Sequence, residues 1–238
     1  MKIAIMGDSI SQGIGSKKIN YSKFLSEKYL VKNFALTGTT IEYGKRIINN
    51  VIEYKPDIVI LFYGNVDALP RVKTDTYIYK KILPNRYKKL GMLDPRALYS
   101  SDIKKKIIQV IDSNFRYRFK NFLVKYQGYE QWVSIDKFEE NYKFVLSELK
   151  KKNINVICTS NILISEKYFK YANKEYLKYN QIIKKLSNNF DAIFIDLYNE
   201  LAKYNSKEIF LNDLYHPNEE GYKLISEIFI NKIDKIII

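Results

Sequence analysis

The sequence contains one cysteine, one histidine and no long hydrophobic run. A single thiol, Cys158, cannot form a disulfide within the chain, so the sequence favours a reducing compartment. No apolar stretch approaches the roughly 20 residues that a membrane-spanning helix requires. The apolar run from Ile3 to Met6 is too short for a signal peptide and ends at once in Gly7. We therefore expect a cytoplasmic protein without a transmembrane segment.

Acidic residues are scarce relative to basic ones, because the 238-residue chain has 26 Asp and Glu against 40 Lys and Arg, a net charge of +14. The excess is concentrated between Pro70 and Gln127, where 15 basic and 4 acidic residues leave a net charge of +11. A concentrated positive field attracts polyanions such as nucleic acid, anionic lipid, acidic polysaccharide or a phosphorylated cofactor. A solubilising lysine surface is the alternative interpretation.

Short β-branched runs alternate with segments of helical periodicity along the chain. Strands are predicted at residues 3–6, 31–36, 58–63, 155–159 and 192–197, and helices at residues 20–29, 41–54, 136–151, 166–188 and 219–233. This alternation predicts an α/β fold, a three-layer α/β/α sandwich around a central, mostly parallel sheet of five strands. The sequence has no internal repeat or low-complexity linker, so residues 1–238 are expected to form a single domain.

From about residue 70 to residue 133 the alternation stops, and we expect a basic, partly helical insertion or lid. Its main helix is predicted over residues 103–125, with apolar positions at Ile107, Ile108, Ile111, Phe115, Phe119 and Phe122 or Leu123. Seven aromatic residues of the insertion are candidates for stacking on sugars, namely Tyr77, Tyr79, Tyr87, Tyr99, Phe115, Tyr117 and Phe119. For Phe115 and Phe119, packing within the insertion's own core is the favoured interpretation.

The chemically interesting residues follow the predicted strands, at the edge where parallel α/β sheets bind ligands. Ser9 comes directly after the first strand, and its hydroxyl is an effective nucleophile only if a base removes its proton. His216 is the only imidazole in the chain. The glycines between Gly7 and Ser16 match neither a phosphate-binding P-loop nor a dinucleotide-binding fingerprint. No metal site is predicted, and the sequence identifies no residues that bind a cofactor.

Three motifs occur in order along the chain: Gly7-Asp8-Ser9-Ile10-Ser11, Asn33-Phe-Ala-Leu-Thr-Gly38 and Asp213-Leu-Tyr-His216. Together they resemble the first, second and fifth sequence blocks of the SGNH or GDSL family of serine esterases and acyltransferases. The resemblance spans the whole chain and implies that family's flavodoxin-like α/β/α topology. It also implies a catalytic triad of Ser9 as nucleophile, His216 as base and Asp213 as its orienting carboxylate. Backbone N–H groups of Ser9 and Gly38 would contribute to the oxyanion hole.

The third block departs from the family pattern. That block reads Gly-x-Asn-Asp in the family, and its Asn side chain donates to the oxyanion. Here it reads Gly64-Asn65-Val66-Asp67, so the amide stands one residue early. Within a strand, a shift of one residue turns a side chain to the opposite face of the sheet. Past the strand end the backbone can bend to compensate, and Asn65 is the favoured third donor.

The triad predicts an acyl-enzyme but does not say what attacks it. Relatives with such a third block and a long insertion resemble proteins of bacterial capsule and surface-polysaccharide pathways. The favoured prediction is an O-acetyltransferase without a tightly bound cofactor, which moves acetyl from acetyl-CoA to an acidic polysaccharide. A carbohydrate acetylesterase, in which water is the acceptor, is the main alternative. A lysophospholipase with the insertion as an interfacial lid is more distant, and a nucleic-acid-binding protein is disfavoured because no nucleic-acid-binding signature is present.

Overall fold

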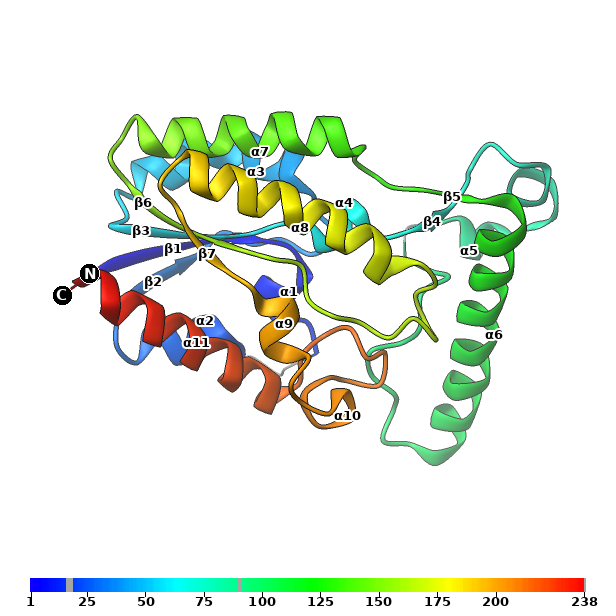
Figure 1. The fold of residues 1–238 in the computed structure, drawn as a ribbon. Helices are drawn as coiled ribbons and strands as arrows, with labels where there is room; N and C mark the ends of the chain where they lie inside the picture. The colour runs from blue at the N-terminus through cyan, green and yellow to red at the C-terminus, as the bar shows by residue number, and fades with distance from the viewer. Residues whose placement is uncertain (16–18, 90, 238) are drawn as a thin grey trace.

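Five parallel strands form the central sheet in the order β2-β1-β3-β6-β7 (Figure 1). The computed structural model describes residues 1–15, 19–89 and 91–237, with side chains as far as residue 235. The strands are β1 (Lys2–Gly7), β2 (Leu30–Asn33), β3 (Ile58–Phe62), β6 (Asn155–Thr159) and β7 (Ile193–Ile195). All five residues of β3 are buried, as expected of an apolar strand covered on both faces.

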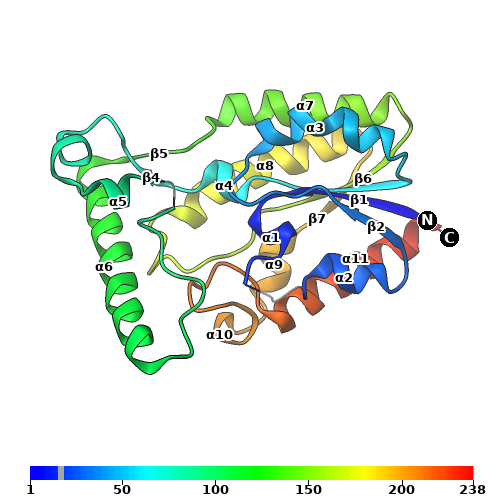
Figure 2. The ribbon, with the colours of Figure 1, turned by 180° about the vertical axis from the view of Figure 1, so that it is seen from behind.

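Helices cover both faces of the sheet, which confirms the predicted α/β/α sandwich. Figures 1 and 2 show α3 (Ile41–Glu53), α7 (Ile135–Lys150) and α8 (Ala172–Asn189) on one face. The other face carries α2 (Tyr21–Ser26), α9 (Leu197–Leu201) and α11 (Glu219–Ile237). The chain moves from β1 to β2 in one direction and from β2 to β7 in the other, and right-handed crossovers in opposite directions put helices on opposite faces. Because all five strands are parallel, their carboxyl ends meet at one edge of the sheet.

Helix α8 begins later than the sequence predicts, at Ala172 instead of residue 166. The Asn173 side chain binds both the N–H and the C=O of Ile164, at 3.2 and 2.9 Å, and so holds the preceding segment as a loop. Tyr171 has a φ of 65°, a left-handed conformation that a helix cannot pass through. The loop that results matters for the site, because the N–H of Ser165 donates to the carbonyl of Leu214.

The segment that interrupts the alternation is closed by a short antiparallel pair, β4 (Arg71–Val72) and β5 (Tyr129–Glu130). Between these strands lie a π-helical turn η1 (Ile78–Ile82), α5 (Asn85–Lys88) and the long helix α6 (Ile103–Gln127). The segment has a small core of its own, formed by Val72, Leu83, Tyr87, Leu93, Leu123 and Val124. In both views α6 stands beyond the carboxyl edge of the sheet (Figures 1 and 2).

The position of α6 agrees with the sequence, but the side of the helix that it buries does not. Ile107, Ile108 and Ile111 are exposed, and so is Phe115, which was expected in the core. Phe119 does pack against the small core, as predicted. The short elements of the insertion cover only one side of α6, and ion pairs occupy much of that side. Helical periodicity in the sequence reveals an apolar stripe but not whether another element covers it.

The remaining short helices lie next to the residues of the candidate site. Helix α1 (Ser9–Gln12) follows β1 directly, α4 (Asn65–Ala68) follows β3, and α10 (Ser206–Ile209) precedes the loop that carries His216. In the part of the chain that the structure describes, no helix is long and apolar enough to cross a bilayer.

Candidate active site

Ser9 is presented by a sharp turn from β1 into α1. A Cβ atom at Gly7 would lie 2.2 Å from the Oγ of Ser11 and 2.9 Å from the carbonyl oxygen of Phe62, so the turn requires glycine. The Asp8 carboxylate caps α1 by accepting the N–H of Ile10 at 2.9 Å. Ser9 is thus the first residue of a helix at the edge where the strands end.

The Asp213–His216 loop is organised by one carboxylate. Oδ1 of Asp213 accepts the N–H groups of Tyr215 and His216, both at 3.1 Å. Oδ2 lies 2.7 Å from Nδ1 of His216. The loop closes because Leu214 takes a left-handed backbone conformation with a φ of 50°, which is costly for a residue other than glycine. The three-residue spacing in the sequence is therefore a compact turn built around Asp213.

The structure brings all three residues of the predicted triad together. Nε2 of His216 lies 3.0 Å from Oγ of Ser9, although the two residues are 207 positions apart. With Nδ1–H directed to Asp213, Nε2 carries the lone pair that accepts the Ser9 proton. The imidazole packs edge-on against the ring of Tyr215, with 4.6 Å between ring centroids. This arrangement has the geometry that activates a serine hydroxyl.

Two backbone N–H groups near Ser9 are available to a ligand. Gly38 has a φ of 70° and lies in a turn that Gln12 holds, because Oε1 of Gln12 accepts from the N–H and the hydroxyl of Thr37. Among the residues that the structure describes, no acceptor is bound by the N–H of Ser9 or of Gly38. Space is open beside Gly38, since no atom lies within 4 Å of where its Cβ would stand.

Asn65 lies in a helix and not in a strand, so the strand-face argument does not apply to it. Its Oδ1 accepts the N–H of Ile162 at 3.0 Å, and its side chain is fully buried. Its Nδ2 has no hydrogen-bond acceptor among the described residues and lies near the Asp8 carboxyl, whose pKa it helps to lower. The Asn65 amide therefore lies beside the carboxyl of Asp8, the residue that precedes Ser9.

The sequence also matches a known protein family. The sequence model of the GDSL-like lipase/acylhydrolase family matches residues 5–224. The chain belongs to this family. Its members are enzymes of the SGNH hydrolase type. No curated protein matches the chain by sequence.

Solved structures of a lipase/acylhydrolase and of acetylxylan esterases share the fold. A lipase/acylhydrolase from Enterococcus faecalis is 17% identical and superposes with a TM-score of 0.62, covering 98% of this chain and 94% of its own. The acetylxylan esterase of Geobacillus stearothermophilus is 16% identical with a TM-score of 0.63, covering 98% and 93%. An acetyl xylan esterase named AlAXEase is 20% identical with a TM-score of 0.61, covering 98% and 100%.

The GDSL-like site also contains two buried carboxyl groups with unusual acidity. Burial raises the pKa of Asp8 to about 6, against the lowering effects of the Ile10 N–H and the nearby His216. Burial raises the pKa of Asp67 to about 8, although this carboxyl accepts the N–H groups of Ile41 and Gly64 at 2.9 and 3.1 Å. Asp67 thereby ties the starts of α3 and α4 together behind the triad. The sequence motifs contain Asp8 and Asp67, but nothing in the sequence predicts that their pKa values are raised.

Sequence reasoning missed Asn161, at the carboxyl end of β6. Its side chain is fully buried, and neither Oδ1 nor Nδ2 has a hydrogen-bond partner within the described ranges. A Cβ at Gly64, where φ is 128°, would lie 2.3 Å from Oδ1 of Asn161, so the two backbones pack closely. The run Thr159-Ser160-Asn161 after an apolar strand was the available signal.

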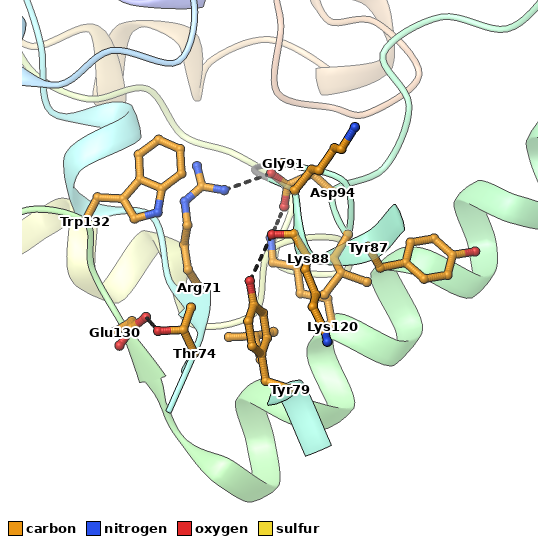
Figure 3. Close-up of a pocket in the computed structure, with 13 residues that line it drawn as sticks. Arg71, Thr74, Tyr79, Tyr87, Lys88, Gly91, Asp94, Lys120, Glu130 and Trp132 are labelled. Carbon is orange, nitrogen blue, oxygen red and sulfur yellow. Dashed lines mark hydrogen bonds and ion pairs between the residues drawn. The ribbon is translucent and has the colours of Figure 1, made fainter. Parts of the chain in front are cut away.

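The insertion forms a pocket of its own, lined by both charged and apolar side chains (Figure 3). The Arg71 guanidinium lies 3.7 Å from the ring centroid of Trp132 and donates to Asp94 at 3.1 Å. The buried Lys120 ammonium binds the same carboxylate. Ser9, Asp213 and His216 do not line this pocket. A chain of ring contacts connects the two sites, because Lys120 lies 4.5 Å over the ring of Phe169, which packs against Tyr215.

No group of three or more His, Cys, Asp or Glu side chains that could hold a metal ion occurs within residues 1–15, 19–89 and 91–235. The prediction that acetyl-CoA is a co-substrate has no test in this geometry and stays a prediction.

Proposed function

We propose that this GDSL-like enzyme is a serine carboxylic-ester hydrolase that removes acetyl groups from the hydroxyls of a carbohydrate. The observation that carries the proposal is the continuous hydrogen-bonded chain from Oγ of Ser9 through His216 to Asp213, at 3.0 and 2.7 Å. Further support comes from the backbone N–H groups of Ser9 and Gly38, which bind no acceptor among the described residues and could stabilise a tetrahedral intermediate. Together they supply the nucleophile, base and electrostatic stabilisation that ester cleavage requires.

In the proposed reaction, Oγ of Ser9 attacks the ester carbonyl carbon while Nε2 of His216 takes the hydroxyl proton. The imidazolium that forms is stabilised by Asp213 and returns the proton to the departing sugar oxygen, which leaves acetyl bound to Ser9. Water then attacks the acyl-enzyme with His216 again as base. Acetate leaves, and the proton returns to Ser9, so the enzyme is regenerated unchanged.

We assign the oxyanion hole to the N–H groups of Ser9 and Gly38, with Nδ2 of Asn65 as the third donor. Support for Asn65 comes from its buried amide beside Asp8, and support for Gly38 comes from the open turn that Gln12 holds. The loss of one such donor typically costs roughly 10²–10³ in turnover. Each assignment can therefore be tested separately.

Hydrolysis is preferred here over the acetyl transfer that the sequence favoured. The matched family is one of lipases and acylhydrolases, and two of the solved structures that share the fold are named acetylxylan esterases. Acetyl transfer to an acidic, capsular-type polysaccharide is the second candidate. Its specific support is the net charge of +11 between Pro70 and Gln127, which complements an acidic glycan or the phosphates of coenzyme A. A cytoplasmic location stays a prediction.

The two candidates differ in the group that attacks the acyl-enzyme. We would measure acetate release from acetylated xylo-oligosaccharides and from acetylated acidic polysaccharides, beside thiol release from acetyl-CoA with the deacetylated forms as acceptors. Hydrolysis predicts acetate release that Ser9→Ala abolishes, with no acceptor-dependent thiol release. Acceptor-dependent release of coenzyme A, without hydrolysis of any acetylated carbohydrate, would contradict the proposal and support transfer.

A further inference from the structure

Helix α6 presents its most apolar side to solvent. Seven of its side chains are between 50% and 76% exposed, namely Ile103, Ile107, Ile108, Ile111, Phe115, Phe122 and Tyr126. At about 100° per residue they fall within one arc of about 140° around the helix. They recur along the whole length of α6, with polar and basic side chains between them, and we call this side of the helix the α6 face.

The opposite arc of α6 is the buried one, and it is more polar than the α6 face. Its buried residues include Ser113, Arg116 and Lys120 beside Leu123 and Val124. Arg116 and Lys120 make ion pairs there with Asp112 and Asp94. A surface helix of a globular protein ordinarily buries its apolar stripe and exposes its polar side. The reversed arrangement indicates that the α6 face is covered by something outside the chain.

The α6 face continues into an open groove of about 730 Å³ beside α5. The floor of this groove is apolar and is formed by Tyr87, Ile108, Ile111 and Phe115. Its charged residues are Arg86, Arg96 and Arg116, with Asp112 as the one carboxylate, so the lining carries a net charge of +2. An apolar floor beside guanidinium groups is complementary to a ligand that joins hydrocarbon to an anionic head group.

Exposed cations lie within and beside the α6 face. At about 100° per residue, Lys104, Arg118 and Lys125 fall inside its arc. Lys105 and Lys106, in the first turn, fall outside it. Within the described part of the chain, none of these five makes an ion pair with a carboxylate. They add to the unpaired positive charge beside an apolar stripe that already lies in water.

We propose that the α6 face docks the enzyme onto an anionic phospholipid surface. Apolar side chains would enter the boundary between head groups and acyl chains, while the five exposed cations of α6 bind lipid phosphates. Because α6 stands beyond the carboxyl edge of the sheet, docking brings the edge that carries Ser9 towards the lipid (Figure 1). The inference concerns the insertion and does not depend on which ester the triad cleaves.

The charge pattern argues against the two other occupants. A second copy would set two α6 helices face to face, each with seven basic residues and one acidic residue, so their like charges would repel. A nucleic acid would bind the cations through phosphates but would leave the isoleucines in water. An anionic bilayer satisfies both the charge and the apolar stripe.

The test is binding of the whole protein to vesicles. We would measure co-sedimentation with vesicles of phosphatidylcholine containing phosphatidylglycerol, beside vesicles of phosphatidylcholine alone. Binding should occur on the anionic vesicles, and the replacement of Lys104, Lys105 and Lys106 by Gln should weaken it by roughly 100-fold. A matched triple variant, with Lys143, Lys184 and Lys223 replaced by Gln, should bind like the wild type, because these exposed lysines lie on α7, α8 and α11.

A second pair of variants separates apolar insertion from charge alone. Ile107→Ser with Ile111→Ser should weaken binding by more than about tenfold, since two buried isoleucine side chains are lost from the lipid phase. Leu30→Ser with Leu177→Ser removes two comparably exposed apolar side chains elsewhere and should have no effect. Circular dichroism and hydrolysis of a soluble acetate ester check that every variant is folded.

Three outcomes would overturn the proposal. The first is absence of binding to anionic vesicles. The second is binding that the serine pair leaves unchanged and that duplex DNA displaces, which would mean a general polyanion site. The third is a wild-type dimer, seen by light scattering without lipid, that the serine pair converts to monomer, because the α6 face would then join two copies of the chain.

Discussion

At the scale of single residues, backbone hydrogen bonds hold the Ser9–His216–Asp213 chain in place. Ser9 is held at the start of α1, and His216 and Asp213 are held in one turn. Asp213 accepts two backbone N–H groups with one oxygen and binds His216 with the other. The base is therefore held in one tautomer by a carboxylate that is itself held by the backbone. Such preorganisation lets a neutral imidazole act on a serine hydroxyl.

Asp213→Asn tests this orienting role. The Asn oxygen can still accept the N–H groups of Tyr215 and His216, so the loop should keep its shape. Its amide would donate to Nδ1 of His216 and force the ring proton onto Nε2, which could then no longer accept from Ser9. We expect kcat to fall by roughly 10⁴ with little change in thermal stability. Activity within tenfold of the wild type would show that Asp213 does not set the tautomer.

Asn65→Ala tests the third oxyanion donor. The change also removes the acceptor of the Ile162 N–H, so a control must lose an equivalent bond. Asn180→Ala serves, because Oδ1 of Asn180 accepts the N–H of Asn161 at 2.7 Å. We expect kcat to fall roughly 10²–10³-fold in Asn65→Ala alone. Equal kcat values in the two variants would leave the oxyanion to the N–H groups of Ser9 and Gly38.

Asp8 gives the site a pH-dependent cost in stability. Burial raises its pKa from 3.8 to about 6 in the folded protein. The folded state therefore holds this proton more tightly, and the stability associated with it is lost as the pH rises from about 4 through about 6. Asp8→Asn keeps an acceptor for the Ile10 N–H but does not titrate.

The difference between wild type and Asp8→Asn isolates this carboxyl. Urea unfolding of both proteins between pH 4.5 and pH 7.5 should show the wild type losing about 2 kcal/mol relative to the variant as the pH rises. Parallel stability curves would mean that Asp8 ionises in the folded protein as it does in water.

At the scale of elements, one carboxylate ties the insertion together. Asp94 binds Arg71 from β4 and Lys120 from α6, and these two cations hold its pKa below the ordinary value against the opposing effect of burial. For Lys120 the roles are reversed, because burial lowers the pKa of its ammonium and the Asp94 carboxylate raises it. The cluster joins the antiparallel pair to the long helix. It matters for stability because the small core of the insertion contains only a few buried apolar side chains.

Asp94→Asn should therefore be strongly destabilising, by about 3–5 kcal/mol, because two buried cations would lose their counter-charge. Urea denaturation at neutral pH measures this directly. A matched surface variant, Asp191→Asn, breaks the exposed ion pair with Lys150 and should change stability by less than about 1 kcal/mol. Similar effects of the two substitutions would mean that the Asp94 cluster does not hold the insertion.

The elements themselves were largely predictable, and the failures have physical causes. The residues of β6 were predicted without error because its apolar run is bounded by polar residues. The late start of α8 was missed because a side-chain bond from Asn173 to Ile164 holds the loop, and no periodicity reports such a bond. The exposed side of α6 was missed because burial depends on neighbouring elements.

At the scale of the whole molecule, the sequence predicts those parts of the site that depend only on the order of strands and helices. Parallel strands bring Ser9 and Gly38 to one edge, and a single histidine leaves little choice of base. The donors that complete the site depend on turns far apart in the sequence. The role of Gln12 in holding the Gly38 turn and the buried amide of Asn161 became visible only in three dimensions.

The distribution of charge also belongs to the whole molecule. The sheet and its covering helices are close to balanced, whereas the segment from Pro70 to Gln127 carries +11 of the net +14. The structure places that segment, with α6, beyond the edge where Ser9 lies (Figure 2). A concentrated positive field of this kind attracts anionic surfaces and substrates.

The most direct measurement is the mass of the acyl-enzyme. The protein would be mixed with an acetylated carbohydrate, quenched in acid within the first turnovers and digested for mass spectrometry. We expect one acetyl group on the peptide that contains Ser9, its loss when Ser9 is replaced by Ala, and its absence in His216→Ala. Turnover of the ester with acetyl on another residue, or with Ser9→Ala still active, would contradict the assignment of Ser9 as the nucleophile.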